Sequence, residues 1–343
     1  MKISVAIYLI LAALAVGGVF AKTRRYKIGL YSVGAVLLIF MAAFRDFSVG
    51  PDTQQYLGKN GFLEIVTLRW NRLVYYKWEF GYTLLNKIVG TIYCNQRFVL
   101  IVITLVILVP LLYRIFRDSR WATLSLVCFF GTQLWESATF LMRQGCAMAV
   151  LTFSYRYCRE RKFLPFLGCV IVATLFHRTA AVWLLLYFVY PLAINRRTLV
   201  ACGAASVLCG IAGPGIFYIL RIFALNEENA GYNGGLPMLV VLWLCVVTVF
   251  VLHKGKIPEQ DRLYYWMLLL AAVMQPVAFT FSNFARIVLY FRIALVLLLP
   301  NTLQDFLPGD KNCGKRAAAG ALLCAVLFVW YAADGLMVYQ IGF

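Results

Sequence analysis

Residues 98–120 read FVLIVITLVILVPLLYRIFRDSR, sixteen uncharged and mostly apolar residues followed by a short segment with three arginines. An apolar run of this length approaches the roughly 20 residues that an α-helix needs to cross a bilayer core of about 30 Å. The same character extends over all 343 residues, since 63% are hydrophobic, 13% are charged and the mean hydropathy is +0.81. This composition excludes a soluble globular protein and predicts an all-α polytopic membrane protein.

About twelve apolar runs of this kind are candidate transmembrane helices. They lie near residues 3–21, 28–44, 98–113, 121–138, 141–155, 163–176, 179–194, 198–217, 237–252, 263–281, 284–299 and 317–333.

The basic residues predict the orientation of these spans. The chain has 32 Lys and Arg against 14 Asp and Glu, an excess that would suggest a nucleic-acid partner in a soluble protein. Here nineteen of the basic residues fall in six short clusters between apolar runs, at 22–27, 114–120, 156–162, 196–197, 254–262 and 311–316. Short cytoplasmic loops gather Lys and Arg, so we interpret the clusters as cytoplasmic loops, with both termini extracytoplasmic and no nucleic acid bound.

The run from Phe163 to Ile194 has 32 residues and is interrupted only by His177 and Arg178. As one helix it would be about 48 Å long, well beyond the thickness of a bilayer. We therefore predict two short helices that turn at His177 and Arg178, in a protein-lined depression below the outer surface.

Residues 45–97 are the one long hydrophilic stretch of a single predicted integral membrane domain, 1–343, and are expected to form an extracytoplasmic loop. Within this loop residues 79–93 are amphipathic, which predicts a helix that lies in the outer interface. Its apolar positions are Phe80, Leu84, Leu85, Ile88 and Ile92, and the opposite side carries Glu79, Thr83, Asn86, Lys87 and Gly90. Four aromatic residues just before or at its start suit the headgroup level of a membrane: Trp70, Tyr75, Tyr76 and Trp78.

Several charged residues lie on the predicted outer side or in the outer halves of spans. The positive-inside rule, which concerns cytoplasmic loops, does not explain them. They include Arg45, Asp52, Glu79, Glu136, Arg143, His177, Arg178, Arg286 and Arg292. A charge at membrane depth costs several kcal/mol unless it is paired or faces water, so each is a functional candidate. Their position on one face predicts an extracytoplasmic cavity lined by arginines.

Guanidinium groups bind phosphate oxygens bidentately and stay charged at any relevant pH. We therefore expect Arg143, Arg178, Arg286 and Arg292 to bind the pyrophosphate of a polyprenyl carrier. Arg292 has a structural alternative, because it could pair internally or extend its charge toward the interface.

Three residues are candidate catalytic groups for proton transfer: His177, Asp52 and Glu79. Asp52 follows Gly50 and Pro51 and could merely cap the turn that they form. Glu79 could serve only to complement the N-terminus of the predicted interfacial helix. The residues alone leave open which of the three acts as a base.

The ten cysteines are scattered through apolar segments without a CxxC or Cys/His ligand spacing. We expect neither disulfides nor a metal site.

Five short motifs follow one another between about residues 45 and 292. They are Val49-Gly-Pro-Asp-Thr-Gln-Gln-Tyr56, Glu79-Phe-Gly-Tyr82, Arg143-Gln144, Phe176-His177-Arg178, and Arg286 with Tyr290-Phe291-Arg292. This ordered set resembles the EpsG family of polysaccharide polymerases, which are relatives of the Wzy O-antigen polymerases.

The resemblance implies an enzyme of the bacterial cytoplasmic (inner) membrane that makes a capsule, an exopolysaccharide or an O-antigen. Its substrate would be an undecaprenyl-pyrophosphate-linked oligosaccharide, whose repeats are joined by glycosyl transfer on the extracytoplasmic face without a cofactor. Flippase and chain-length regulator proteins are expected partners beside the lipid bilayer. The motifs also suggest Thr53, Tyr56 and Gln144 as further substrate-binding residues.

Two other functions remain open at this stage. A transporter or flippase of lipid-linked oligosaccharide would also place many spans around an arginine-lined cavity. A membrane acyltransferase that uses His177 as its base is a third class.

Overall fold

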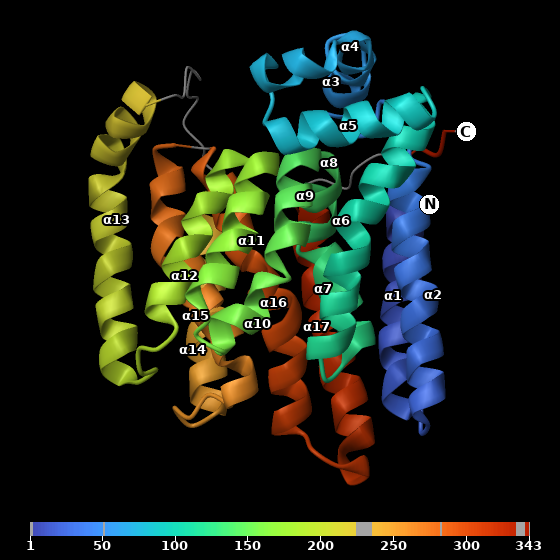
Figure 1. Ribbon diagram of the computed structural model, residues 1–343. Coiled ribbons are helices and arrows are strands. Elements are labelled where there is room, and N and C mark those ends of the chain that lie inside the picture. Colours follow the sequence, from blue (N-terminus) through green and yellow to red (C-terminus); the bar gives the residue numbers. More distant parts are fainter. Residues whose placement is uncertain (1–2, 51, 224–234, 282, 334–339, 343) are drawn as a thin grey trace. The chain divides into compact units, whose positions relative to one another are not determined.

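The computed structural model describes residues 3–50, 52–223, 235–281, 283–333 and 340–342 (Figure 1). These residues fall into two compact units, which we describe separately. Unit one comprises Met1–Ala181 and Leu303–Phe343, and unit two comprises Val182–Thr302. In the described residues every named element is helical, and an isolated antiparallel bridge joins Arg45 and Ile341. That the chain forms a single membrane domain stays a prediction.

Unit one holds most of the helices. Its elements are α1 (Ile3–Phe20), α2 (Arg24–Ala43), α3 (Thr53–Leu57), α4 (Phe62–Thr67), η1 (Trp70–Tyr75), α5 (Phe80–Ile92), α6 (Gln96–Asp118), α7 (Ala122–Gly131), α8 (Leu134–Phe140), α9 (Met142–Leu151), α10 (Ser154–Arg159), α11 (Phe163–Phe176), η4 (Asp310–Asn312) and α17 (Cys313–Ala333). Helix η2 (Arg178–Trp183) begins in unit one and continues into unit two.

Unit two holds the remaining elements. They are α12 (Leu184–Val189), α13 (Arg196–Phe223), α14 (Gly235–Leu252), α15 (Glu259–Met274), η3 (Gln275–Phe279) and most of α16 (Phe284–Phe306).

Eight helical segments of the described chain are long and apolar enough to cross a membrane, as a multi-pass membrane protein requires. They are α1, α2, α6, the first 20 residues of α13, α14, α15 with η3, α16 and α17. Each coincides with one of the twelve predicted spans. The other four predicted spans, at 121–138, 141–155, 163–176 and 179–194, contain shorter helices. A count of about twelve therefore stays a prediction.

The predicted span at 121–138 is not one continuous helix. Gln133 adopts a left-handed backbone conformation with φ of 58° and separates α7 from α8. A residue in this conformation cannot continue a right-handed helix. Helix α9 then starts directly after Leu141 and packs closely on α8, where Gly145 lies against the backbone carbonyl of Ala138.

The break at His177 is confirmed. Helix α11 ends at Phe176, and His177 is extended with φ −157° and ψ 116°. Its backbone N–H still donates to the carbonyl of Ala173 at 3.0 Å, after which η2 begins at Arg178. The imidazole therefore projects from the end of a helix.

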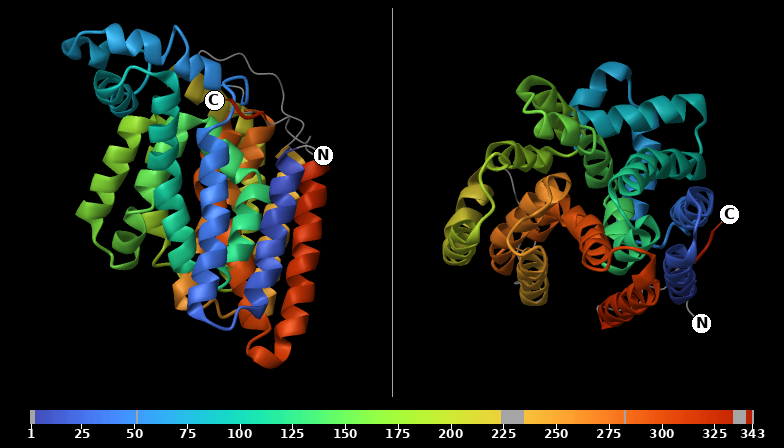
Figure 2. Two further views of the ribbon diagram at one scale, coloured as in Figure 1. Left: turned by 90° about the vertical axis from the view of Figure 1, so that its right-hand side faces the viewer. Right: turned by 90° about the horizontal axis from the view of Figure 1, so that it is seen from below.

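In unit one α1 packs against α2, α7 and α17, and α2 packs against α6 (Figure 2). Residues 45–95, with α3, α4 and α5, cover one end of these helices, which we call the loop end (Figure 1). Residues 340–342 also reach this end, since Asp46 N–H donates to the Gln340 carbonyl at 2.8 Å. The opposite end, which we call the basic end, carries the turns between α1 and α2 and between α6 and α7.

Helix α5 turns its polar side toward the protein. Thr83, Asn86 and Lys87 are buried, whereas Ile88 and Ile92 are exposed. The Lys87 ammonium donates to the carbonyls of Val66 and Leu68, each at 2.7 Å, and so holds α4 on α5. The apolar side is thereby left outward, and its placement in the membrane interface stays a prediction.

Candidate functional site

The carboxylate of Glu79, at the loop end of unit one, is the centre of the candidate site. Its Oε2 accepts from Arg143 Nη1 at 2.7 Å, and its Oε1 lies 3.0 Å from His177 Nδ1. The backbone N–H of Arg178 donates to the same Oε1 at 3.2 Å. The start of α5, α9, the end of α11 and the start of η2 therefore meet in a single cluster. We call it the Glu79 cluster, and its members are Glu79, Arg143, His177 and Arg178.

A glycine allows these elements to approach so closely. A Cβ atom added at Gly81 would lie only 2.8 Å from the carbonyl oxygen of Leu175, in the last turn of α11. No real side chain tolerates that distance, so the first turn of α5 can rest on the end of α11 only with glycine at this position. Glu79 lies two residues before Gly81, and His177 lies two residues after Leu175. The contact between Gly81 and Leu175 therefore brings Glu79 beside His177.

Neither acidic candidate acts as a helix cap. Glu79 and Asp52 occupy the N-cap positions of α5 and α3, yet neither side chain makes a capping hydrogen bond. Asp52 therefore lacks the capping hydrogen bond of its structural alternative, whereas Glu79 still lies at the start of α5, where its charge complements the helix N-terminus. The Glu79 carboxylate binds the other members of the cluster, whereas Asp52 is half-buried and its side chain makes no capping hydrogen bond.

The environment of Glu79 keeps it ionised. Burial alone raises the pKa of Glu79, but the hydrogen bond with His177 and the charge of Arg143 outweigh this effect and lower the pKa to about 2. An ionised carboxylate can only accept hydrogen bonds, so His177 Nδ1 carries the proton of the shared bond. In neutral imidazole the lone pair then lies on Nε2, which has no hydrogen-bond partner among the described residues.

Arg143 is held in place by aromatic rings as well as by Glu79. Its guanidinium carbon lies 5.7 Å from the centre of the Tyr56 ring and 5.8 Å from that of Trp78, within cation–π range. Its Nε donates to the Tyr56 hydroxyl at 3.4 Å. The side chain is 23% exposed, against 7% for Glu79 and 65% for Arg178. Arg143 is thus fixed and partly open, whereas Arg178 extends into solvent.

Tyr56 was among the predicted substrate-binding residues, but the packing of Trp78 beside it was not anticipated. Trp78 is buried and packs on Tyr56 and Tyr82 with ring centres 5.1 and 5.7 Å apart, and its place at the headgroup level stays a prediction. Trp70 and Tyr75, in contrast, are exposed. The position of Trp78 directly before Glu79 was the available sequence signal.

The other predicted substrate-binding residues have varied surroundings. Thr53 is buried and donates its hydroxyl to the Val49 carbonyl at 2.7 Å, which shapes the turn before α3. Gln144 is buried next to Arg143 in α9. Arg286 is exposed and Arg292 is half-buried in α16, and both belong to unit two. Their binding roles stay predictions.

Two further charges from the outer side have structural contacts. Arg45 is fully buried and donates to the carbonyls of Ala42 and Thr139 at 2.7 and 2.9 Å. Glu136 accepts from the Tyr331 hydroxyl at 2.8 Å. Both buried charges therefore have hydrogen-bond partners inside the protein.

The Glu79 cluster suits an anion better than a cation. Both carboxylate oxygens are engaged by donors, and two arginines border one acidic group. A metal ion would have to displace those donors and overcome the excess positive charge. An anionic ligand would instead find a guanidinium that is exposed and one that is already oriented.

Comparison with known protein families gives one result. The family model described as the EpsG family matches residues 28–341, nearly the whole chain. Neither the comparison with curated proteins nor that with solved structures found a match. The matched range includes every residue of the Glu79 cluster, and this family is associated with the polymerisation of surface polysaccharides. The chain therefore belongs to the EpsG family.

Proposed function

We propose that this protein joins oligosaccharide repeats carried on undecaprenyl pyrophosphate, on the extracytoplasmic face of the membrane. Family membership supports polymerisation of a surface polysaccharide. The observation that carries the chemistry is the hydrogen bond between Glu79 and His177, because it leaves a proton-accepting imidazole nitrogen beside two arginines.

Joining two repeats requires deprotonation of an acceptor hydroxyl. In the proposed reaction His177 Nε2 takes this proton while the hydroxyl oxygen bonds to the anomeric carbon of the donor glycan. Glu79 binds Nδ1–H, holds the ring in one tautomer and stabilises the imidazolium that forms, as a carboxylate does in catalytic triads.

The bond that breaks joins the anomeric carbon to the pyrophosphate oxygen. Undecaprenyl pyrophosphate leaves with the electron pair, so negative charge develops on that oxygen. Arg143 and Arg178 would stabilise this charge. The proton on His177 then passes to solvent or to the leaving group, which returns the imidazole to its neutral form.

Arg143 and Arg178 are unequal in this scheme. Arg143 is pre-oriented by Glu79, Tyr56 and Trp78, so binding costs it little conformational entropy. Arg178 is exposed and reaches the ligand by moving its side chain. We assign Arg143 to the reacting phosphate oxygen and Arg178 to the rest of the pyrophosphate.

Purified protein with undecaprenyl-pyrophosphate-linked repeats tests the proposal. We expect longer glycans together with one released undecaprenyl pyrophosphate for each new glycosidic bond. Movement of intact lipid-linked repeats across proteoliposomes, without new glycosidic bonds, would instead support the flippase alternative.

A further inference from the structure

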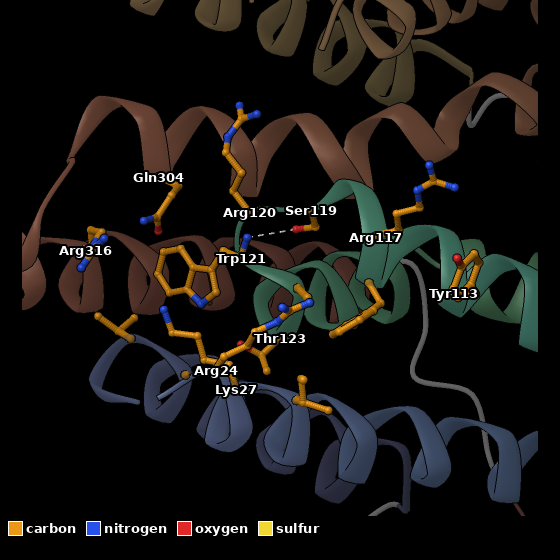
Figure 3. A pocket seen from close by; sticks show the side chains of 15 residues that line it. Arg24, Lys27, Tyr113, Arg117, Ser119, Arg120, Trp121, Thr123, Gln304 and Arg316 are labelled. Atoms are coloured by element: carbon orange, nitrogen blue, oxygen red, sulfur yellow. Dashed lines mark hydrogen bonds between the residues drawn. The ribbon is translucent and has the colours of Figure 1, made fainter. Parts of the chain in front are cut away.

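The basic end of unit one contains a cavity of about 420 Å³, which shares no residue with the Glu79 cluster. The lining residues come from α1, α2, α6, α7 and α17, from the turn before α7, and from the end of α16 that belongs to unit one (Figure 3). Its volume falls within the roughly 300–1,000 Å³ typical of small-molecule sites. Helix α2 has 20 residues and is about 30 Å long, and it runs from the cavity at its first turn to the loop end at its last.

Positive charge dominates the lining. Three of the six basic clusters in the sequence meet here and contribute Arg24, Lys27, Arg117, Arg120 and Arg316. No acidic side chain is among the described residues that line the cavity. Arg120 turns toward α16 and pairs with Asp305 at 2.7 Å, which leaves four lining cations without an ion pair to a described residue.

Arg316 is the second, independent sign of a ligand. Its side chain lines the cavity although the residue is only 8% exposed, and its Nε is buried without a hydrogen-bond partner in the described residues. A buried guanidinium without a counter-charge is costly, and an anion in the cavity would remove that cost.

Helix ends add to the positive potential. The first turns of α2, α7 and α17 contribute Arg24, Thr123 and Arg316 to the lining. The N-terminus of a helix carries a partial positive charge and favours anions. Figure 3 shows the side chains of Arg24 and Lys27 extending from α2 toward Trp121.

Membrane orientation alone does not require this arrangement. The positive-inside rule needs basic residues in cytoplasmic loops, but it needs neither their convergence nor their burial. The exposed pair Arg196 and Arg197 at the start of α13 satisfies that rule without any cavity.

We propose that this basic cavity binds a phosphate-bearing anion, independently of the Glu79 cluster. A lipid headgroup is the source that the surroundings favour, because exposed apolar side chains continue from the cavity along α2 and α6. These are Val33, Val36, Leu105 and Val109. Basic pockets between transmembrane helices on the cytoplasmic side are known to take anionic headgroups.

The test measures retention of phosphatidic acid and of phosphatidylcholine by native mass spectrometry of the purified full-length protein. A second arm titrates inorganic pyrophosphate in detergent and follows the thermal unfolding midpoint. The cavity variant is Arg24→Gln with Arg117→Gln, both exposed and therefore compatible with folding. The matched control is Arg196→Gln with Arg197→Gln, which removes the same charge elsewhere.

We expect the wild type to retain phosphatidic acid over phosphatidylcholine, and the cavity variant to bind it at least about tenfold more weakly than the control does. Stabilisation by pyrophosphate alone, lost in the same variant, would identify a soluble phosphate compound as the ligand. Equal binding by the cavity variant and the control in both arms, or no phosphate binding by the wild type, would overturn the proposal.

Discussion

Glu79 and His177 are 98 positions apart in the chain, and Oε1 of the one lies 3.0 Å from Nδ1 of the other. This hydrogen bond joins the start of α5 to the end of α11. The bond orients the imidazole of His177, and the proposed acid–base role of the pair depends on this orientation. Every prediction about catalysis below depends on it.

The close contact at Gly81 predicts a sensitive position that carries no chemistry. In Gly81→Ala the new methyl group must push α5 away from Leu175, and Glu79 moves with it. A displacement of about 1 Å at a catalytic group can cost on the order of 10²-fold in rate, and we expect a loss of that size.

Glycan joining by purified Gly81→Ala protein measures this effect. Gly168→Ala is the control, since no atom lies within 4 Å of a Cβ added at that position in α11. Equal rates in the two variants would show that the approach of α5 to α11 does not position the site.

Arg143→Lys should lower glycan joining by at least about tenfold. Lysine keeps the charge and can still pair with Glu79, but it loses the planar fork that contacts Tyr56 and Trp78 and binds phosphate bidentately. Arg178→Lys should have a smaller effect, because Arg178 is largely exposed and its backbone N–H, which the substitution retains, makes the bond to Glu79.

The exposed loop residue Arg72 gives a matched control as Arg72→Lys. Steady-state rates of glycan joining with a lipid-linked repeat show whether Arg143→Lys loses more activity than Arg178→Lys. Wild-type rates in Arg143→Lys would mean that only positive charge is needed there.

The low pKa of Glu79 predicts a pH-dependent contribution to stability. Because folding lowers this pKa from 4.5 to about 2, the ionised carboxylate stabilises the fold above about pH 4.5, and this contribution is lost as the pH falls toward 2. Glu79→Gln should therefore be less stable than wild type at pH 7, by about 2 kcal/mol, since Arg143 loses its charged partner.

Thermal unfolding in detergent between pH 7 and pH 3 measures this difference, which we expect to narrow below about pH 4.5. Glu64→Gln removes an exposed carboxylate from the same loop and serves as the control. A difference that stays constant over the whole range would contradict the stabilised carboxylate.

Much of the fold follows from the sequence because membrane helices need long apolar runs. Eight of the predicted runs coincide with helices that meet this requirement, and the break at His177 follows from a length that no bilayer spans. The break at Gln133 was missed, because a left-handed residue inside an apolar segment leaves no mark in hydropathy.

The site was predictable only as a set of separate residues. Glu79, Arg143 and His177 could each be selected as charges that membrane orientation leaves unexplained. That Glu79 binds the other two depends on the packing of α5 on α11 at Gly81, which periodicity cannot indicate. That Trp78 is buried against Tyr56 and Tyr82 could not be predicted, because composition alone does not show whether a tryptophan is buried.

Labelling of Cys94 tests the proposed orientation. Cys94 is exposed at the loop end, whereas Lys22 is exposed at the basic end, in the turn between α1 and α2. In a background without the other cysteines, an impermeant maleimide should label Cys94 in intact cells. It should label Lys22→Cys, in a variant without Cys94, only after the membrane is opened. Labelling of both positions in intact cells would contradict this orientation.

The rate of glycan joining by His177→Ala is the most direct test of the central claim. With purified protein and undecaprenyl-pyrophosphate-linked repeats, we expect a loss of at least about 10²-fold, the scale of a missing general base. His253→Ala removes the other histidine of the chain, whose ring contacts Thr302 in unit two, and should react at the wild-type rate. Wild-type turnover by His177→Ala, with collapse instead in Asp52→Asn, would show that the base lies elsewhere in the loop and would contradict the account.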